Sequence, residues 1–311
     1  MTLLLRRSLL FFFLLFCVLA SSRAAEWAVV IVSSERSAAY QETADAMLAE
    51  LVRGGVARRD VHQMTVAEWS AAGAPGARLF ITLGLDAAGV LARSEVRTPV
   101  LCTLLPLASF ERVLRDSGRR ASSQFTALYL NQPLARQLDL ARLALPQARR
   151  IGVLLGGESL AQRSQLEDAA ETRGLKLVSA KVAPQEPVFN DLKKILDDAD
   201  LLLALADPQI YNSSSIQNIL LTSFRARVPM LAFSPAYVRA GALLAVYSTP
   251  TQIGQQAGTM ARSFLQGRPL GMPQYPQDFS VSVNEHVARS LGLNLEPQAL
   301  AERLRRLEKG P

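Results

Sequence analysis

After residue 25 the chain alternates between short apolar runs and segments with a helical repeat. The runs that are apolar almost throughout are residues 28–32, 79–83, 100–104, 151–155, 201–205 and 230–233. Runs of this length without alternating polar residues are typical of strands buried on both faces of a parallel sheet. The segments between them, such as residues 40–51, 134–145 and 215–225, predict helices. This order predicts an α/β protein whose mostly parallel sheets are flanked by helices.

The same order of strands and helices occurs twice. Asp86 lies 51 positions after Glu35, and Asp207 lies 49 positions after Glu158, each acidic residue following an apolar run. We therefore predict two lobes of similar topology.

The first 25 residues have a different composition. Arg6 and Arg7 precede an apolar run at residues 9–20, which is shorter than the ~20 residues that a membrane-spanning helix needs. Small residues follow, so we predict a secretory signal peptide at residues 1–24 and export to the periplasm. An uncleaved anchor is the alternative. A lipid anchor at Cys17 is not expected, because a bulky phenylalanine precedes that cysteine.

Charge excludes one class of partner. The signal segment holds three arginines and no acidic residue, so its removal lowers the net charge from +7 to +4. The basic residues near the C-terminus are interrupted by acidic ones, in the order Glu302, Arg303, Arg305, Arg306, Glu308 and Lys309. This pattern is typical of a solvated helix face, and we expect no nucleic-acid partner.

The residues that usually carry catalysis or hold metals are scarce. Cys102 is the one cysteine left after export and lies in an apolar run, and neither His62 nor His286 has a second metal ligand at a telling spacing. Serine-nucleophile and nucleotide-binding glycine motifs are absent from the sequence. We predict a binding protein without catalytic residues, metal or cofactor.

Two parallel-sheet lobes present loops at the carboxyl ends of their strands, and a small polar solute is expected in a cleft between them. The predicted ligand-binding residues are Ser34, Glu35, Gly84, Asp86, Asn131, Gly157, Glu158, Asp207, Tyr211, Asn212, Ser234 and Tyr237.

Each of these residues has an alternative, purely structural role. Asp207 would bind a solute amine or hydroxyl, or cap a helix start. Glu35 and Glu158 would contact a solute, or lie in first helical turns where the helix dipole favours them. Tyr211 and Tyr237 would stack on a solute, or be half-buried loop aromatics. The glycines would admit a solute, or only allow the turn.

Several sequence blocks between about residues 124 and 293 resemble one known family. They are residues 145–155, 200–212, 228–233, 240–246, 253–254, 282–284 and 290–293. In this order they are similar to the substrate-binding proteins of ABC transporters with the type I periplasmic binding protein fold. Residues 26–123 resemble that family less, which predicts a divergent first lobe.

The resemblance implies that the chain crosses between the lobes three times. The crossings are expected near residues 128–131, 247–250 and 277–279. The N-terminal lobe would then comprise residues 25–129 plus 249–277, and the C-terminal lobe residues 130–248 plus 278–311.

The resemblance also implies a function. The protein would close its lobes around a small solute, an amino acid or similar organic molecule with aromatic amino acids as the first expectation, and deliver it to a membrane permease. The alternative is a periplasmic sensing subunit for a membrane receptor or histidine kinase. A scaffold without a ligand is a third possibility.

Overall fold

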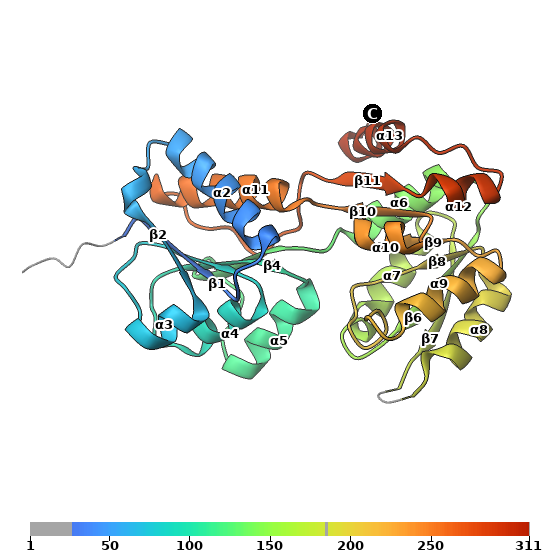
Figure 1. The fold of residues 1–311 in the computed structure, drawn as a ribbon, viewed down its shortest axis with the longest axis horizontal. Helices are drawn as coiled ribbons and strands as arrows, with labels where there is room; N and C mark the ends of the chain where they lie inside the picture. Colours follow the sequence, from blue (N-terminus) through green and yellow to red (C-terminus); the bar gives the residue numbers. More distant parts are fainter. Residues whose placement is uncertain (1–26, 184–185, 311) are drawn as a thin grey trace, which may run out of the picture.

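The computed structural model describes residues 27–183 and 186–310, in which the strands form two separate sheets (Figure 1). The signal peptide predicted at residues 1–24 lies outside the described residues. The strands are β1 (Val29–Ser33), β2 (Val61–Thr65), β3 (Phe80–Leu83), β4 (Val100–Leu105), β5 (Phe125–Tyr129), β6 (Arg150–Leu155), β7 (Lys176–Lys181), β8 (Leu201–Leu203), β9 (Met230–Ala232), β10 (Leu244–Tyr247) and β11 (Ser280–Val283). The helices are α2 (Ala38–Arg53), α3 (Val66–Ala72), α4 (Leu85–Arg93), α5 (Leu107–Ser117), α6 (Leu134–Ala144), α7 (Arg163–Glu171), α8 (Val188–Asp198), α9 (Ile216–Arg225), α10 (Pro235–Ala240), α11 (Pro250–Leu265), α12 (Glu285–Ser290) and α13 (Pro297–Lys309), with 3-10 turns η1 (Arg58–Asp60) and η2 (Leu160–Gln162).

The first sheet has the order β2-β1-β3-β4-β5, and all its pairs are parallel. Successive residues of β1 face opposite sides. Val29 and Ile31 pack with α2 and α11, whereas Val30 and Val32 pack in the core that α3, α4 and α5 cover. Both faces are therefore apolar, which explains why β1 has no polar residue from Val29 to Val32.

Helix α11 joins the first lobe although it follows the second lobe in sequence. It lies beside α2 (Figure 1), and two of its glycines make the close approach possible. A Cβ atom on Gly254 would lie 2.4 Å from the Thr43 carbonyl oxygen, and one on Gly258 would lie 2.6 Å from the Glu50 Cβ atom. Any larger residue at either position would separate the two helices.

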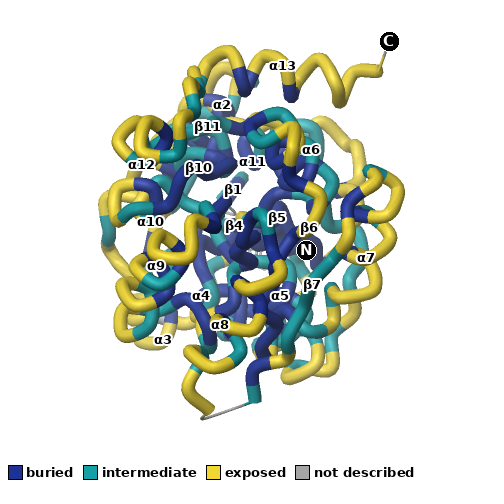
Figure 2. Tube along the Cα trace, turned by 90° about the vertical axis from the view of Figure 1, so that its right-hand side faces the viewer, coloured by how far each residue is buried: buried dark blue, intermediate teal, exposed yellow. Residues whose placement is uncertain are grey.

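The second sheet has the order β11-β10-β9-β8-β6-β7 and is parallel except at β11, which runs antiparallel to β10. Helices α8, α9 and α10 cover one face, and α6, α7 and α13 cover the other. Figure 2 shows the strands buried inside, while much of the outer surface of the helices is exposed. The prediction of two α/β lobes with mostly parallel sheets is confirmed.

The polypeptide passes between the sheets in three places (Figure 1). The first connection runs from β5 to α6, the second from β10 to α11, and the third from α11 to β11. The third connection first adds to the edge of the first sheet, since Tyr129 N–H donates to the Gln274 carbonyl at 2.9 Å. Throughout residues 27–183 and 186–310, no helix combines the length and apolar character that a membrane crossing needs.

Candidate functional site

The twelve predicted site residues all follow the carboxyl ends of strands. In the first sheet they follow β1, β3 and β5, and in the second sheet they follow β6, β8 and β9. This placement follows from the parallel topology, which brings the carboxyl ends of neighbouring strands to one edge of each sheet.

In the first lobe, Ser34 and Gly84 hold two loops together. The Ser34 hydroxyl donates to the Leu83 carbonyl and accepts from Ala87 N–H, both at 3.0 Å. Gly84 has a φ of +90°, and a Cβ atom there would lie 2.3 Å from the Tyr40 hydroxyl oxygen. Both residues therefore have a local structural role whether or not a solute is present. Glu35 and Asp86 are exposed.

A hollow of about 540 Å³ opens beside these loops, at the carboxyl ends of β1 and β2. Its lining includes Glu35, Tyr40, Gln63 and Glu68. Burial, followed by the nearby Glu35 carboxylate, raises the pKa of Tyr40, so its hydroxyl stays protonated. Arg36 also lines the hollow and pairs with Glu68 at 2.6 Å, so this wall offers charges of both signs and a hydroxyl. The sequence analysis missed its β2 half because β2 was not predicted.

The contacts of Asp207 in this structure are with the neighbouring loops of the second lobe. It is 1% exposed, and its carboxylate accepts from Ser159 N–H at 2.9 Å, Ser159 Oγ at 2.7 Å, Glu158 N–H at 3.1 Å and Gln209 N–H at 3.0 Å. No helix begins at Asp207, since the next one is α9. In this structure Asp207 joins the loop after β6 to the loop after β8, and its role as a solute ligand stays a prediction.

Gly157 and Asn212 belong to the same pair of loops. Gly157 N–H donates to Gln209 Oε1 at 2.8 Å. The Asn212 side-chain oxygen accepts from Ser214 N–H and Ser215 N–H, at 3.0 and 3.2 Å. The side chain of Asn212 therefore shapes its own turn, in the way that asparagine commonly does.

Three aromatic residues cluster at this edge of the second sheet. The ring of Tyr237 lies edge-on to Phe233, with 4.9 Å between centroids, and both lie near Tyr211. Tyr211 is only 5% exposed, and burial with the nearby Asp207 carboxylate raises the pKa of its hydroxyl. Tyr211 therefore backs the cluster from inside, while the half-buried Phe233 and Tyr237 have surface left for contact. Ser234, between them in sequence, is half-buried and is the N-cap residue of α10.

Glu158 makes a direct contact between the lobes. Its carboxylate pairs with Arg112 of α5 at 2.5 Å and accepts from the Ser109 hydroxyl at 3.4 Å. The Glu158 side chain is 15% exposed and that of Arg112 is 41% exposed. Sequence reasoning missed Arg112, because it lies on a helix rather than in a loop. One feature of the sequence could have indicated Arg112: it lies one helical turn after Ser109, on a helix that begins just after the carboxyl end of β4.

Asn131 positions that helix. Its side-chain oxygen accepts from Leu107 N–H at 2.9 Å, at the first residue of α5. The N-cap residue of α5 is Pro106, which has no side-chain oxygen to satisfy this N–H. Asn131 therefore orients the helix that carries Arg112.

Within the part of the chain that the structure describes, the two histidines and Cys102 have no neighbours that suggest catalysis. His62 stacks on Trp27 with 4.8 Å between ring centroids, and His286 contacts Arg289. Burial raises the pKa of the Cys102 thiol to about 12, which keeps it protonated and unreactive. Among the residues described, no three His, Cys, Asp or Glu side chains lie together as metal ligands would.

Two lobes with parallel sheets, three connections and polar loops at the strand ends define a type I periplasmic binding protein fold. The chain belongs to the family of ABC transporter substrate-binding proteins, whose family model matches residues 64–304. This match begins at residue 64, within the first lobe, and covers the whole second sheet. Members of this family are periplasmic or otherwise extracytoplasmic solute-binding proteins and not enzymes. The sensory alternative is not favoured.

Individual relatives agree with this family. A tyrosine-binding protein of Clostridioides difficile (strain R20291) is 23% identical over 191 residues, which are 60% of this chain and 54% of that protein. The chain thus spans about half the length of this curated relative. Among solved structures, a ligand-free, open substrate-binding protein with adhesive properties from Clostridium difficile has a TM-score of 0.67 at 17% identity, covering 86% of this chain and 95% of that one. An ABC domain in complex with L-Trp from Streptococcus pneumonia has a TM-score of 0.60 at 16% identity, covering 88% and 98%.

Proposed function

We propose that this protein is the exported solute receptor of an ABC uptake system and that its solute is an amino acid, with aromatic amino acids first. The family supports a receptor role. The names of two relatives, one tyrosine-binding and one in complex with L-Trp, support the solute class.

The observation that carries the solute class is the ion pair between Arg112 and Glu158. An amino acid has one carboxylate and one ammonium group, which complement a guanidinium and a carboxylate held on opposite lobes. The solute carboxylate would pair with Arg112 and the solute ammonium group with Glu158. Both protein charges would then keep a partner, and the solute would join the two lobes. Phe233 and Tyr237, half-buried at the same edge of the second lobe, would contact an aromatic side chain of the solute.

The mechanism we propose is ligand-stabilised closure. The moving bodies are residues 25–129 plus 249–277 and residues 130–248 plus 278–311, joined by the three connections. A solute that contacts both lobes binds the closed arrangement more tightly than the open one and shifts the population toward it. The closed form would then be presented to a membrane permease. Removal of residues 1–24 on export would release the receptor into the periplasm.

A thermal-shift screen of the mature chain from Ala25 tests this function. We expect L-tyrosine or L-tryptophan to raise the melting temperature saturably, because a ligand at 100 times its Kd stabilises the folded state by about 2.7 kcal/mol. Sugars, purines, organic acids and oligoamines serve as comparison classes. A saturable response to one of those classes alone would contradict the amino-acid proposal.

Two variants on α5 test whether Arg112 binds the solute carboxylate. Arg112→Gln should weaken binding of the responding amino acid at least tenfold by calorimetry, since the solute carboxylate loses its cation. Arg115→Gln, three residues further along the same helix and exposed, should leave the Kd unchanged. If both variants bound the amino acid with the same Kd, Arg112 would not be a solute-binding residue.

A further inference from the structure

One buried arginine contacts two of the three connections between the lobes. Arg136, in the first turn of α6, is 6% exposed. Its guanidinium donates to Gln132 Oε1 at 2.7 Å in the first connection. It also donates to the carbonyls of Pro276 at 2.9 Å and Gln277 at 3.3 Å in the third connection. These two connections are thereby fixed to each other.

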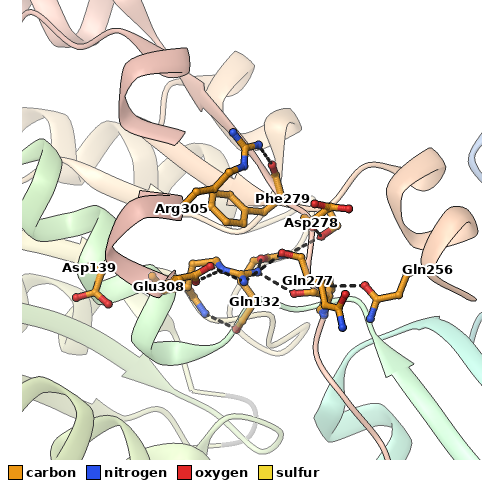
Figure 3. Close-up of polar contacts among 12 residues, drawn as sticks. Gln132, Asp139, Gln256, Gln277, Asp278, Phe279, Arg305 and Glu308 are labelled. Atoms are coloured by element: carbon orange, nitrogen blue, oxygen red, sulfur yellow. Dashed lines mark hydrogen bonds and ion pairs between the residues drawn. The ribbon is translucent and has the colours of Figure 1, made fainter. Parts of the chain in front are cut away.

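The second connection is tied into the same network. Gln132, which is 2% exposed, donates through Nε2 to the Ser248 hydroxyl at 2.9 Å. That hydroxyl in turn donates to the Asp278 carbonyl at 2.6 Å. Figure 3 shows Gln132, Gln277 and Asp278 close together around these contacts. Gln132 therefore links the first connection to the second and, through Arg136, to the third.

The charge of Arg136 is balanced from the C-terminal helix. Glu308, in the last turn of α13, forms an ion pair with Arg136 through both carboxylate oxygens. The side chain of Arg136 is 7% exposed and that of Glu308 is 30% exposed. A buried guanidinium without a counter-charge is strongly unfavourable, so this arrangement of the hinge depends on Glu308.

Helix α13 makes a second contact with the hinge through Phe279. The guanidinium carbons of Arg136 and Arg305 lie 4.4 and 5.0 Å from the centroid of the Phe279 ring. Arg305 also donates to the Phe279 carbonyl at 2.9 Å (Figure 3). Phe279 is buried and directly precedes β11, so the end of the third connection is held from both sides.

We propose that α13 is a hinge clamp, in which Glu308 acts through Arg136 as a positioning residue that sets the resting angle between the lobes. The hydrogen bonds from Arg136 to the Pro276 and Gln277 carbonyls join the two bodies that move relative to each other when the lobes rotate. The other contacts of the network hold Arg136 and the ends of the connections in place. Loss of Glu308 would therefore weaken the described arrangement and broaden the range of lobe orientations. Most of the polar residues of α13 are exposed to solvent. Arg305 and Glu308 are the two that contact the hinge.

The test measures the distance between the lobes by pulsed EPR on the full mature chain without any solute. Spin labels are attached at Ala49→Cys on α2 and Lys193→Cys on α8, both exposed positions, while Cys102 is buried and stays unlabelled. We expect Glu308→Gln to shift or widen the distance distribution. Glu302→Gln, an exposed position on the same helix, is the matched control and should leave it unchanged.

A second variant keeps the proposal testable if Glu308→Gln folds poorly. Ser248→Ala removes the hydrogen bonds that tie the second connection to the first and the third, with little change in volume, and it should widen the same distribution. Unchanged distributions in both variants would overturn the clamp, even if their melting temperatures fall. Because no solute is used, this result is independent of the proposed amino-acid function.

Discussion

At the scale of single residues, the loops of the second lobe depend on one carboxylate. Asp207 accepts hydrogen bonds from the main chain and hydroxyl of Ser159, 48 positions earlier in the sequence. A Cβ atom on Gly156 would lie 2.7 Å from the same carboxylate, so the two loops are packed as closely as their atoms allow. Asp207 thus determines where Glu158, the residue that bridges the lobes, is held.

We therefore predict that Asp207→Ala destabilises the folded protein. It leaves several buried N–H and O–H donors without an acceptor, which should lower the free energy of unfolding by about 2–4 kcal/mol. Urea unfolding followed by circular dichroism measures this change. Asp197→Ala, at an exposed position on α8, is the control and should stay within about 0.5 kcal/mol of wild type. A fully stable Asp207→Ala protein that has lost solute binding would contradict this structural role and support Asp207 as a solute ligand.

The sequence predicted where the candidate residues lie relative to the strands, but not which groups they contact. Their positions followed from topology, since parallel strands carry their loops to one edge. Their partners did not follow, because Ser34 bonds across 53 positions to Ala87 and Asp207 across 48 to Ser159. A carboxylate that binds a solute and one that binds a distant loop look identical in a single sequence.

At the scale of elements, the glycines of α11 fasten a late segment of the chain onto the first lobe. Gly254→Ala would place a Cβ atom 2.4 Å from a main-chain oxygen of α2, which cannot move as a flexible side chain can. We predict that this substitution lowers the free energy of unfolding by about 1–3 kcal/mol, the usual effect of overpacking. Gly271→Ala, which meets no atom within 4 Å, is the control in the same urea experiment. Equal stabilities would show that α2 and α11 separate without cost.

The elements that sequence reasoning found and missed differ in burial. The strands at the centre of each sheet were apolar throughout and were predicted within one or two residues at most ends. β2 is an edge strand whose pattern includes His62 and Gln63, so it gives no apolar run, and α3 is only seven residues long. The C-terminal helix was predicted as a solvated face, yet Leu300 and Leu304 are buried and two of its charged residues reach the hinge.

At the scale of the whole molecule, the lobes meet at the three connections and at the Arg112–Glu158 ion pair. The connections carry a network of buried hydrogen bonds, and the ion pair is partly open to solvent. Motion is therefore expected as a rotation about the connections that makes or breaks contacts between the loops. This arrangement fits a receptor whose closed form is recognised by its transporter.

Lobe closure is tested by small-angle X-ray scattering of the mature chain with and without a saturating amino acid from the thermal-shift screen. We expect a smaller radius of gyration with the amino acid present, because the solute draws the two lobes together. A sugar that gives no thermal shift should leave the radius unchanged. An unchanged radius with a saturating, tightly bound amino acid would contradict closure of the lobes as the central event in function.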